Sequence, residues 1–124
     1  MKKRILVVDD SETALAMARE ALEEGGFEVV TALDAKEADT YLFAAKQPDL
    51  VILDVMMPML NGDKMAKLLK QNEQTRHIPI LLLSSKPEAE LRWLVSESGA
   101  DGFIRKPFGH RQIVAMVEEA IQRK

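Results

Sequence analysis

The sequence predicts an α/β fold in which five parallel strands alternate with five helices, and three observations support this. Short apolar runs bounded by turn residues recur along the 124 residues, and segments with helical spacing of apolar residues lie between them. The composition, 47% hydrophobic and 30% charged, is typical of a chain that forms a core. Strict alternation favours a parallel sheet with helices on both faces, so we expect one domain spanning residues 1–124.

Five segments are predicted strands. Four of them are nearly continuous apolar runs, the pattern of strands that are buried on both faces, and they cover residues 5–8, 50–53, 80–83 and, more weakly, 102–104. Residues 27–33 form the remaining strand, because this segment is rich in β-branched side chains such as Val29, Val30 and Thr31.

Five helices are predicted between and after these strands. Ser11 can cap the first helix, Asp34 with Glu37 resembles a capping box for the second, and Gly99 suits the end of the fourth. The apolar positions with helical spacing are Ala14, Leu15, Ala18 and Leu22; Ala35, Ala38, Leu42 and Ala45; Met65, Leu68 and Leu69; Leu91, Leu94 and Val95; and Ile113, Val117, Ala120 and Ile121.

Five such units fit a flavodoxin-like (βα)5 doubly wound parallel sheet with the strand order 2-1-3-4-5. In that order the first and third strands are neighbours, and ligands bind beyond the carboxyl ends of the strands at this switch point. We therefore expect the functional site to follow Val8 and Leu53.

Polar residues follow the predicted strands at this edge. Asp9 and Asp10 come after the first strand, Asp54 after the third, Ser84 after the fourth and Lys106 after the fifth. Clustered carboxylates repel one another unless a cation is present, and an all-oxygen cluster suits Mg²⁺. Magnesium beside a carboxylate suggests phosphoryl chemistry, in which a lysine offsets charge and a hydroxyl binds a phosphoryl oxygen.

Each of these residues also has an ordinary structural interpretation. Two aspartates before a helix are common as caps and as partners of the helix dipole, and a single Asp54, Ser84 or Lys106 is more often structural than functional. Their occurrence together at successive strand ends favours the functional interpretation.

Composition and charge exclude several classes of function. A formal net charge of -3 argues against direct nucleic-acid binding and against binding to anionic membranes, since both require a basic face. The absence of cysteine excludes disulfides and zinc–thiolate sites. The apolar run at residues 5–8 is too short for a signal peptide, and no stretch approaches the ~20 apolar residues of a membrane span. We expect a soluble, cytoplasmic protein.

From residue 5 to about residue 121 the sequence resembles the response regulator receiver domain family of two-component signalling. The stretches that carry the resemblance are ILVVDDS, PDLVILDVMMPMLNG, PILLLSS and GADGFIRKPF. The resemblance implies that Asp54 takes a phosphoryl group from a sensor histidine kinase, a phosphotransfer protein or a small acyl phosphate, and becomes an aspartyl phosphate. It also implies that the protein is no enzyme beyond catalysing its own phosphorylation and dephosphorylation.

The resemblance assigns metal-binding roles as well. It implies that Asp10 and Asp54 bind Mg²⁺ directly together with the backbone carbonyl of Met56, while Asp9 contributes through water. Two further positions, Met56 and Lys86, tune the lifetime of the phosphoryl group in this family. Apolar Met56 shielding the acyl phosphate and Lys86 pairing with it predict slow self-dephosphorylation. The alternative is that both side chains face solvent and have no kinetic role.

The resemblance implies a switch as well. Ser84 and Lys106 are expected to hold the phosphoryl oxygens, Phe103 to turn inward, and the peptide bond between Lys106 and Pro107 to be cis. The face formed by the fourth helix, the fifth strand and the fifth helix then rearranges, so that it meets a downstream protein target or pairs with a second copy.

Two other functions remain as alternatives. The chain could be an interaction module of the same fold that binds partners without phosphorylation, although the acceptor, metal pair, hydroxyl and lysine are all present. It could also be a phosphatase with an aspartate nucleophile, but such enzymes carry an Asp-x-Asp motif after the first strand, whereas here Asp9 and Asp10 are adjacent.

Overall fold

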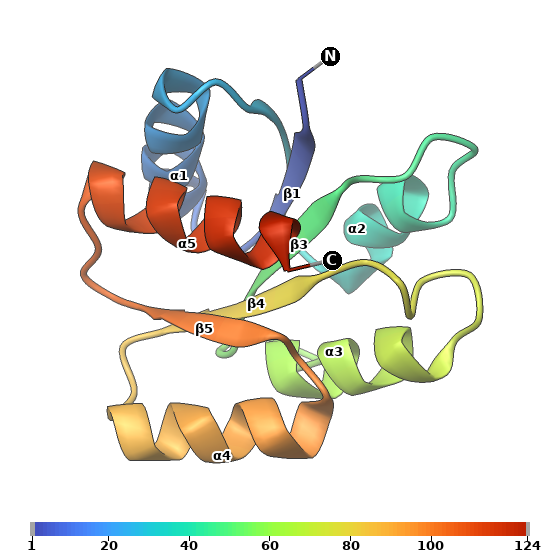
Figure 1. Ribbon diagram of the computed structural model, residues 1–124. Coiled ribbons are helices and arrows are strands. Elements are labelled where there is room, and N and C mark those ends of the chain that lie inside the picture. Colours follow the sequence, from blue (N-terminus) through green and yellow to red (C-terminus); the bar gives the residue numbers. More distant parts are fainter. Residues whose placement is uncertain (1, 124) are drawn as a thin grey trace.

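The computed structural model describes residues 2–123, and its strands and helices alternate as predicted (Figure 1). The strands are β1 (Arg4–Val8), β2 (Glu28–Ala32), β3 (Leu50–Asp54), β4 (Ile80–Ser84) and β5 (Gly102–Arg105). The helices are α1 (Glu12–Glu24), α2 (Ala35–Leu42), α3 (Gly62–Gln71), α4 (Glu88–Ser98) and α5 (His110–Gln122). The predicted fold class is confirmed.

The five strands form one parallel sheet in the order β2-β1-β3-β4-β5, which confirms the predicted topology. The register between β1 and β3 pairs Val8 with Leu53. Asp9 and Asp54, the residues that directly follow this pair, therefore lie side by side at the carboxyl edge of the sheet.

The helices cover the sheet on both faces. Helices α1 and α5 pack on one face and α2, α3 and α4 on the other (Figure 1). Successive side chains of a strand point to opposite faces, so in β1 Ile5 and Val7 join the core under α1 and α5, whereas Leu6 and Val8 join the core under the other three helices. The central strands are buried from both sides, which is why they read as continuous apolar runs.

The predicted helix ends are largely observed. The Ser11 hydroxyl accepts a hydrogen bond from the Ala14 N–H at 3.2 Å, and the Asp34 carboxylate accepts one from the Glu37 N–H at 2.8 Å. The Asp34 half of the expected capping box is therefore formed. Gly99 ends α4 in the left-handed region with a φ of 81°, a conformation that glycine adopts without steric cost.

Three details of the sequence prediction are wrong. Ala45 lies beyond the end of α2 and is exposed, because α2 stops at Leu42, whose carbonyl accepts a hydrogen bond from the Gln47 side chain at 2.8 Å. Leu68 is exposed rather than buried, since Ala66 occupies the core-facing position in that turn of α3. The second strand is one residue shorter at each end than the predicted 27–33.

Among residues 2–123, no helix combines the length and the apolar character needed to cross a membrane.

Candidate functional site

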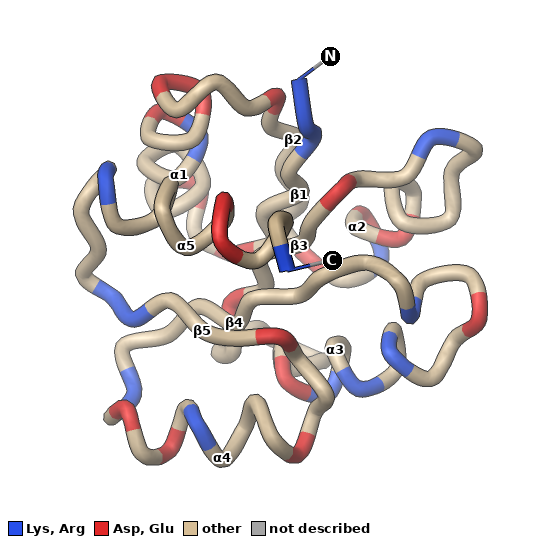
Figure 2. The backbone as a smooth tube through the Cα atoms, in the orientation of Figure 1, with Lys and Arg blue, Asp and Glu red and all other residues tan. Residues whose placement is uncertain are grey.

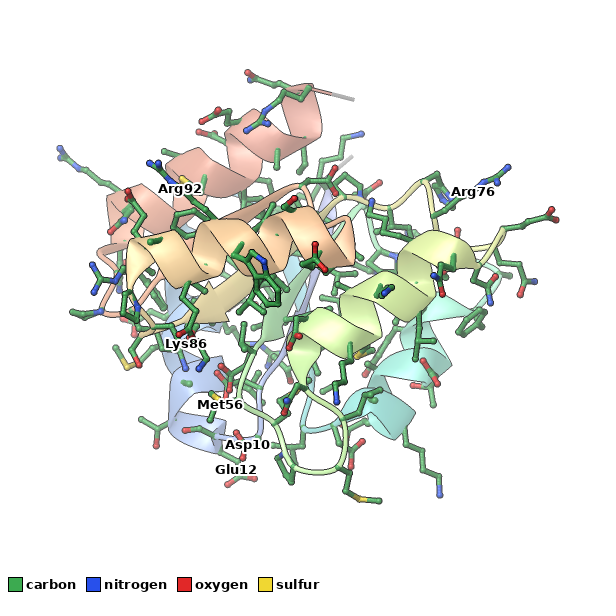
Figure 3. All side chains as sticks on the ribbon, turned by 90° about the horizontal axis from the view of Figure 1, so that it is seen from below. Asp10, Glu12, Met56, Arg76, Lys86 and Arg92 are labelled. Carbon is green, nitrogen blue, oxygen red and sulfur yellow. The ribbon has the colours of Figure 1, made fainter. Side chains whose placement is uncertain are left out.

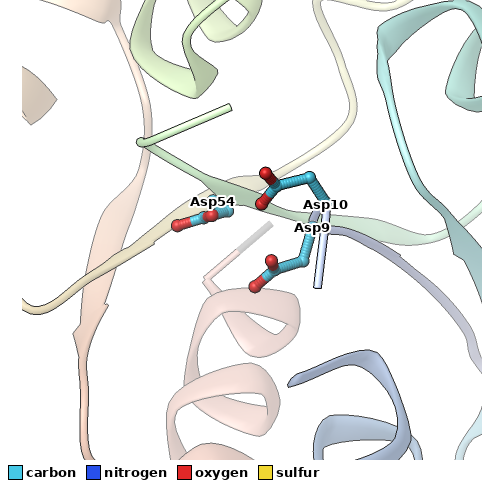
Figure 4. A group of neighbouring side chains, drawn as sticks. All are labelled: Asp9, Asp10 and Asp54. Atoms are coloured by element: carbon cyan, nitrogen blue, oxygen red, sulfur yellow. The ribbon is translucent and has the colours of Figure 1, made fainter. Parts of the chain in front are cut away.

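Three aspartates meet at the carboxyl edge of the sheet. Asp9 and Asp10 directly follow β1, and Asp54 is the last residue of β3. One carboxylate oxygen of each lies within 4.8 Å of the others (Figure 4). Asp9 and Asp54 are buried, whereas Asp10 is exposed. The parallel arrangement and the register of β1 and β3 bring these side chains together, as the sequence predicted.

Lys106 provides a cation beside this acidic cluster. Its Nζ lies 3.2 Å from Asp9 Oδ2 and 3.6 Å from Asp54 Oδ1. The lysine directly follows β5, and its backbone N–H donates to the Ser84 carbonyl at 2.8 Å, so the end of β4 fixes its position. The peptide bond between Lys106 and Pro107 is cis.

The electrostatics of the cluster favour an additional cation. The pKa of Asp54 is raised from 3.8 to about 6, chiefly because burial penalises the charged carboxylate and secondly because Asp9 is also negative. Lys106 and a hydrogen bond from the backbone of Met56 act in the opposite direction on this pKa. The cluster therefore holds three carboxylates, and the one lysine beside it pairs with the two that are buried. A hard divalent cation such as Mg²⁺ fits this all-oxygen set and would relieve the repulsion.

Ser84 is buried at the end of β4, the strand next to β3. Its hydroxyl oxygen accepts a hydrogen bond from the Lys86 N–H at 3.1 Å, which leaves its own O–H able to donate. Among the hydrogen bonds of residues 2–123, none joins Ser84 to the three aspartates. Ser84 therefore lies at the predicted edge of the sheet, on the strand next to Asp54, without a hydrogen bond to the acidic cluster.

Lys86 and Met56 lie at the same end of the molecule as Asp10 (Figure 3). The Met56 side chain is 62% exposed. The Lys86 ammonium forms an ion pair with Glu90 of α4 at 2.8 Å, so in this arrangement its charge is directed to the helix rather than to Asp54. In Figure 2 the segment that joins β4 to α4 carries a basic residue, and acidic residues follow it in the first turn of α4.

Two contacts of Lys86 were not foreseen from the sequence. Glu90 follows it by four residues, and this lysine–glutamate spacing was a readable signal for an ion pair, although Lys86 lies just before α4 and not in it. Arg105 of β5 donates from Nε to the Lys86 carbonyl at 3.0 Å. No signal in the sequence indicated this second contact, because it depends on how the segment between β4 and α4 lies against β5.

Phe103 lies in β5, away from the aspartates. It pairs in register with Leu82 of β4, is partly buried, and packs against the core that α2, α3 and α4 cover. The structure therefore brings together Asp9, Asp10, Asp54 and Lys106. Ser84 and Phe103 lie on the neighbouring strands β4 and β5, and among residues 2–123 neither forms a side-chain hydrogen bond with the three aspartates.

Known proteins match this chain over nearly its whole length. Residues 5–118 match the family model described as the response regulator receiver domain. The chain is 41% identical over 123 residues to the alkaline phosphatase synthesis transcriptional regulatory protein PhoP of Bacillus subtilis, covering 99% of this chain and 50% of that protein. It is 38% identical over 123 residues to the phosphate regulon transcriptional regulatory protein PhoB of Escherichia coli, covering 99% and 53%. The chain thus spans about half the length of these curated relatives.

Solved structures resemble it as well. The chemotaxis response regulator CheY4 of Vibrio cholerae superposes with a TM-score of 0.88 at 30% identity, over 97% of this chain and 99% of that one. The response regulator DrrB of Thermotoga maritima, described as an OmpR/PhoB homolog, gives a TM-score of 0.83 at 28% identity, over 99% of this chain and 54% of that one.

Proposed function

The chain belongs to the response regulator receiver domain family of two-component signalling, and from this premise we propose that it is a magnesium-dependent switch phosphorylated on Asp54. One observation carries the proposal: the buried Asp54 carboxylate shares a cluster with Asp9 and Asp10 and lies 3.6 Å from the Lys106 ammonium. We take residues 1–124 as one receiver domain.

Phosphorylation of Asp54 is an exchange of one bond for another. A carboxylate oxygen of Asp54 attacks phosphorus, so that a new P–O bond forms. With a phosphohistidine donor the P–N bond breaks and its electron pair leaves with the imidazole; with a small acyl phosphate the P–O bond to the carboxylic acid breaks instead. Dephosphorylation reverses the modification when water attacks phosphorus, which releases phosphate and restores the Asp54 carboxylate. We propose no reaction beyond these two.

The acidic cluster has the donors for Mg²⁺. Asp10 and Asp54 would hold the ion directly with the Met56 carbonyl, and Asp9 would contribute through water. A bound ion supplies positive charge that offsets the negative charge of the transferring phosphoryl group. The raised pKa of Asp54 supports this assignment, since burial first and the neighbouring Asp9 second penalise its negative charge, and a bound cation would offset both.

Lys106 and Ser84 would hold the phosphoryl oxygens. Lys106 is already directed at Asp54, with its Nζ 3.6 Å from Oδ1. Ser84 has an O–H free to donate at the end of the neighbouring strand. A phosphoryl group brings about two negative charges and new acceptor oxygens, so both residues would interact more strongly with the modified aspartate than with the free one.

The switch would act through the face formed by α4, β5 and α5. Movement of Ser84 toward the phosphoryl group, with Phe103 turning inward, would change the packing of this face. We propose a sensor histidine kinase or a phosphotransfer protein as the phosphodonor, and a downstream protein target or a second phosphorylated copy as the recipient. A cytoplasmic location stays a prediction.

An interaction module that works without phosphorylation is the competing function, and site mapping separates the two. The protein is incubated with acetyl phosphate and Mg²⁺, reduced with borohydride, which converts an aspartyl phosphate to homoserine, and digested for peptide sequencing by mass spectrometry. We expect homoserine at position 54. Labelling at another carboxylate, with Asp54 unchanged, would refute the assignment.

A further inference from the structure

The start of α3 lies directly against the backbone of Asp54, and Gly62 makes this contact possible. A Cβ atom added at Gly62 would lie 2.1 Å from the Asp54 carbonyl oxygen, 2.8 Å from its carbonyl carbon and 3.2 Å from the Cα of Val55. All three atoms belong to the backbone, so a side-chain rotation cannot relieve the overlap.

The requirement for glycine here comes from space and not from conformation. Gly26 and Gly99 are the glycines with positive φ within residues 2–123, and Gly62 is the first residue of a regular helix. Alanine would therefore suit the backbone angles of Gly62 and would favour the helix. Its single extra carbon, however, could be accommodated only if α3 and the end of β3 moved apart.

The same contact closes the segment between β3 and α3. The Gly62 N–H donates to the Val55 carbonyl at 3.1 Å, and the Val55 N–H donates to the Leu83 carbonyl of β4 at 3.0 Å. Val55 and Met57 are buried, with Met56 exposed between them. The backbone of Met56 is thus held from both sides by buried neighbours. The hydrogen bond from Gly62 to Val55 joins the two ends of the segment, which we call its base.

We propose that Gly62 is a positioning residue, which sets where the Asp54 carboxylate and the Met56 backbone lie relative to Asp9, Asp10 and Lys106. The inference rests on the proposed function, because it concerns the geometry of the same site. In the proposed function Asp54 is the phosphoacceptor and the Met56 carbonyl is a metal ligand. Displacing their backbone would therefore change phosphorylation and Mg²⁺ binding together.

The expected displacement is large on the scale of catalysis. An ordinary contact between a carbon and an oxygen needs about 3.5 Å, so alanine at position 62 must separate the two backbones by about 1 Å or more. A misplacement of about 1 Å can reduce a rate by about 100-fold. We expect Gly62→Ala to lower the rate of Asp54 phosphorylation by at least about tenfold and to weaken Mg²⁺ binding.

The test compares Gly62→Ala with Gly25→Ala. A Cβ at Gly25 would lie 2.7 Å from Val114 Cγ2, at the end of α1 and away from the acidic cluster, so this variant also strains the fold without touching the site. Four quantities are measured on the folded protein: the thermal midpoint, the Mg²⁺ dissociation constant from calorimetry, and the kcat and KM of labelling by acetyl phosphate.

The proposal predicts that both variants lose thermal stability but only Gly62→Ala loses Mg²⁺ affinity and kcat, with KM for acetyl phosphate changed less than kcat. If Gly62→Ala bound Mg²⁺ and reacted like Gly25→Ala, the positioning role would be refuted while the proposed function stood. If the wild-type protein were not labelled at all, the proposed function would fail, and the Mg²⁺ affinities would still decide the role of Gly62.

A second measurement covers the case in which Gly62→Ala does not fold. In the wild-type protein, NMR should show a scalar coupling across the hydrogen bond from the Gly62 N–H to the Val55 carbonyl, and slow hydrogen exchange at the Gly62 amide. A Gly62 amide that exchanged as fast as that of fully exposed Met59 would overturn the proposal, because the segment would then be open at its base.

Discussion

The Lys106 ammonium lies 3.2 Å from the carboxylate of Asp9, a residue 97 positions earlier in the sequence. Asp9 is almost completely buried, and the lysine is partly buried beside it. The pair links the end of β1 to the segment that follows β5, and Asp54 of β3 lies within 3.6 Å of the same ammonium. The charge of one lysine is therefore divided between two buried carboxylates, and several properties of the site follow from this.

Removal of this cation is expected to raise the pKa of Asp54 further. Lys106→Met deletes the positive charge that lowers this pKa, so in the metal-free protein the pKa should rise above about 6. Carbon-13 NMR of the Asp54 carboxyl during a pH titration measures it. Lys67→Met, on the exposed side of α3, is the control and should leave the titration unchanged. An unaltered pKa in Lys106→Met would show that the lysine does not act on Asp54.

The stability of the metal-free protein should fall as pH rises through the range in which Asp54 ionises. The folded state binds the Asp54 proton more tightly than the unfolded state, because the pKa is about 6 in the fold and 3.8 as the ordinary value. The contribution of this group to the free energy of unfolding is therefore complete below about pH 4 and lost above about pH 6. Asp54→Asn should stabilise the metal-free protein at pH 7 by on the order of 1 kcal/mol.

Urea unfolding of wild type and Asp54→Asn at pH 4 and pH 7 tests this sign. The difference between the two proteins should favour the variant at pH 7 and shrink at pH 4. A variant that is less stable than wild type at pH 7 without metal would contradict the account, since it would mean that the ionised carboxylate stabilises the fold.

Magnesium should stabilise the protein at neutral pH. A ligand at ten times its dissociation constant adds about 1.4 kcal/mol to the free energy of unfolding. The effect should disappear on chelation, and it should weaken below pH 6 because protonated Asp54 is a poor metal ligand. Differential scanning calorimetry with and without Mg²⁺ measures it. Asp10→Asn should lose the effect and Asp63→Asn on α3 should keep it; an equal gain in both variants would place the ion elsewhere.

The lifetime of the phosphoryl group should depend on Met56. Its side chain is exposed next to the site, so we expect it to shield the acyl phosphate from water. Met56→Asn replaces it with a group that can hydrogen-bond an attacking water, and the decay of phosphorylated protein should accelerate by about tenfold. Phosphate release after removal of the donor gives the rate. Met59→Asn, a fully exposed position of the same segment, is the control, and equal decay in wild type and Met56→Asn would refute the role.

Met59 itself is expected to be strained. It is the non-glycine residue with a positive φ, 70°, within residues 2–123, and its side chain makes almost no packing contacts because it is fully exposed. The left-handed conformation costs most residues about 1–2 kcal/mol, and asparagine tolerates it better. Met59→Asn should therefore raise the free energy of unfolding by about 0.5 kcal/mol, as measured by urea unfolding. A loss of stability would indicate a packing role for this side chain.

The sequence was sufficient to predict the sheet and the edge where the aspartates meet. Continuous apolar runs identified the buried strands, and the parallel order made Asp9 and Asp54 neighbours, because residues that follow paired strands share an edge. Periodicity was less reliable at element ends. It did not show that Gln47 would bond the last carbonyl of α2 and leave Ala45 outside the helix.

Details of the site could not be predicted because they depend on how separate segments approach each other. Gly62 is part of an Asn-Gly pair that is typical of a turn, and nothing local shows that it touches the backbone of Asp54. Lys86 was expected to reach the phosphoryl group, whereas in the structure its ammonium pairs with Glu90. Whether it leaves Glu90 when a dianion arrives depends on an energy balance that sequence spacing does not contain.

The intact mass of the protein after incubation with acetyl phosphate and Mg²⁺ tests the central claim most directly. Wild type should gain the mass of one phosphoryl group, while Asp54→Ala and a chelator-treated sample should gain none. A phosphoryl gain in Asp54→Ala equal to that of wild type, or no gain in wild type under conditions where calorimetry shows Mg²⁺ bound, would contradict the assignment of Asp54 as the acceptor of small acyl phosphates.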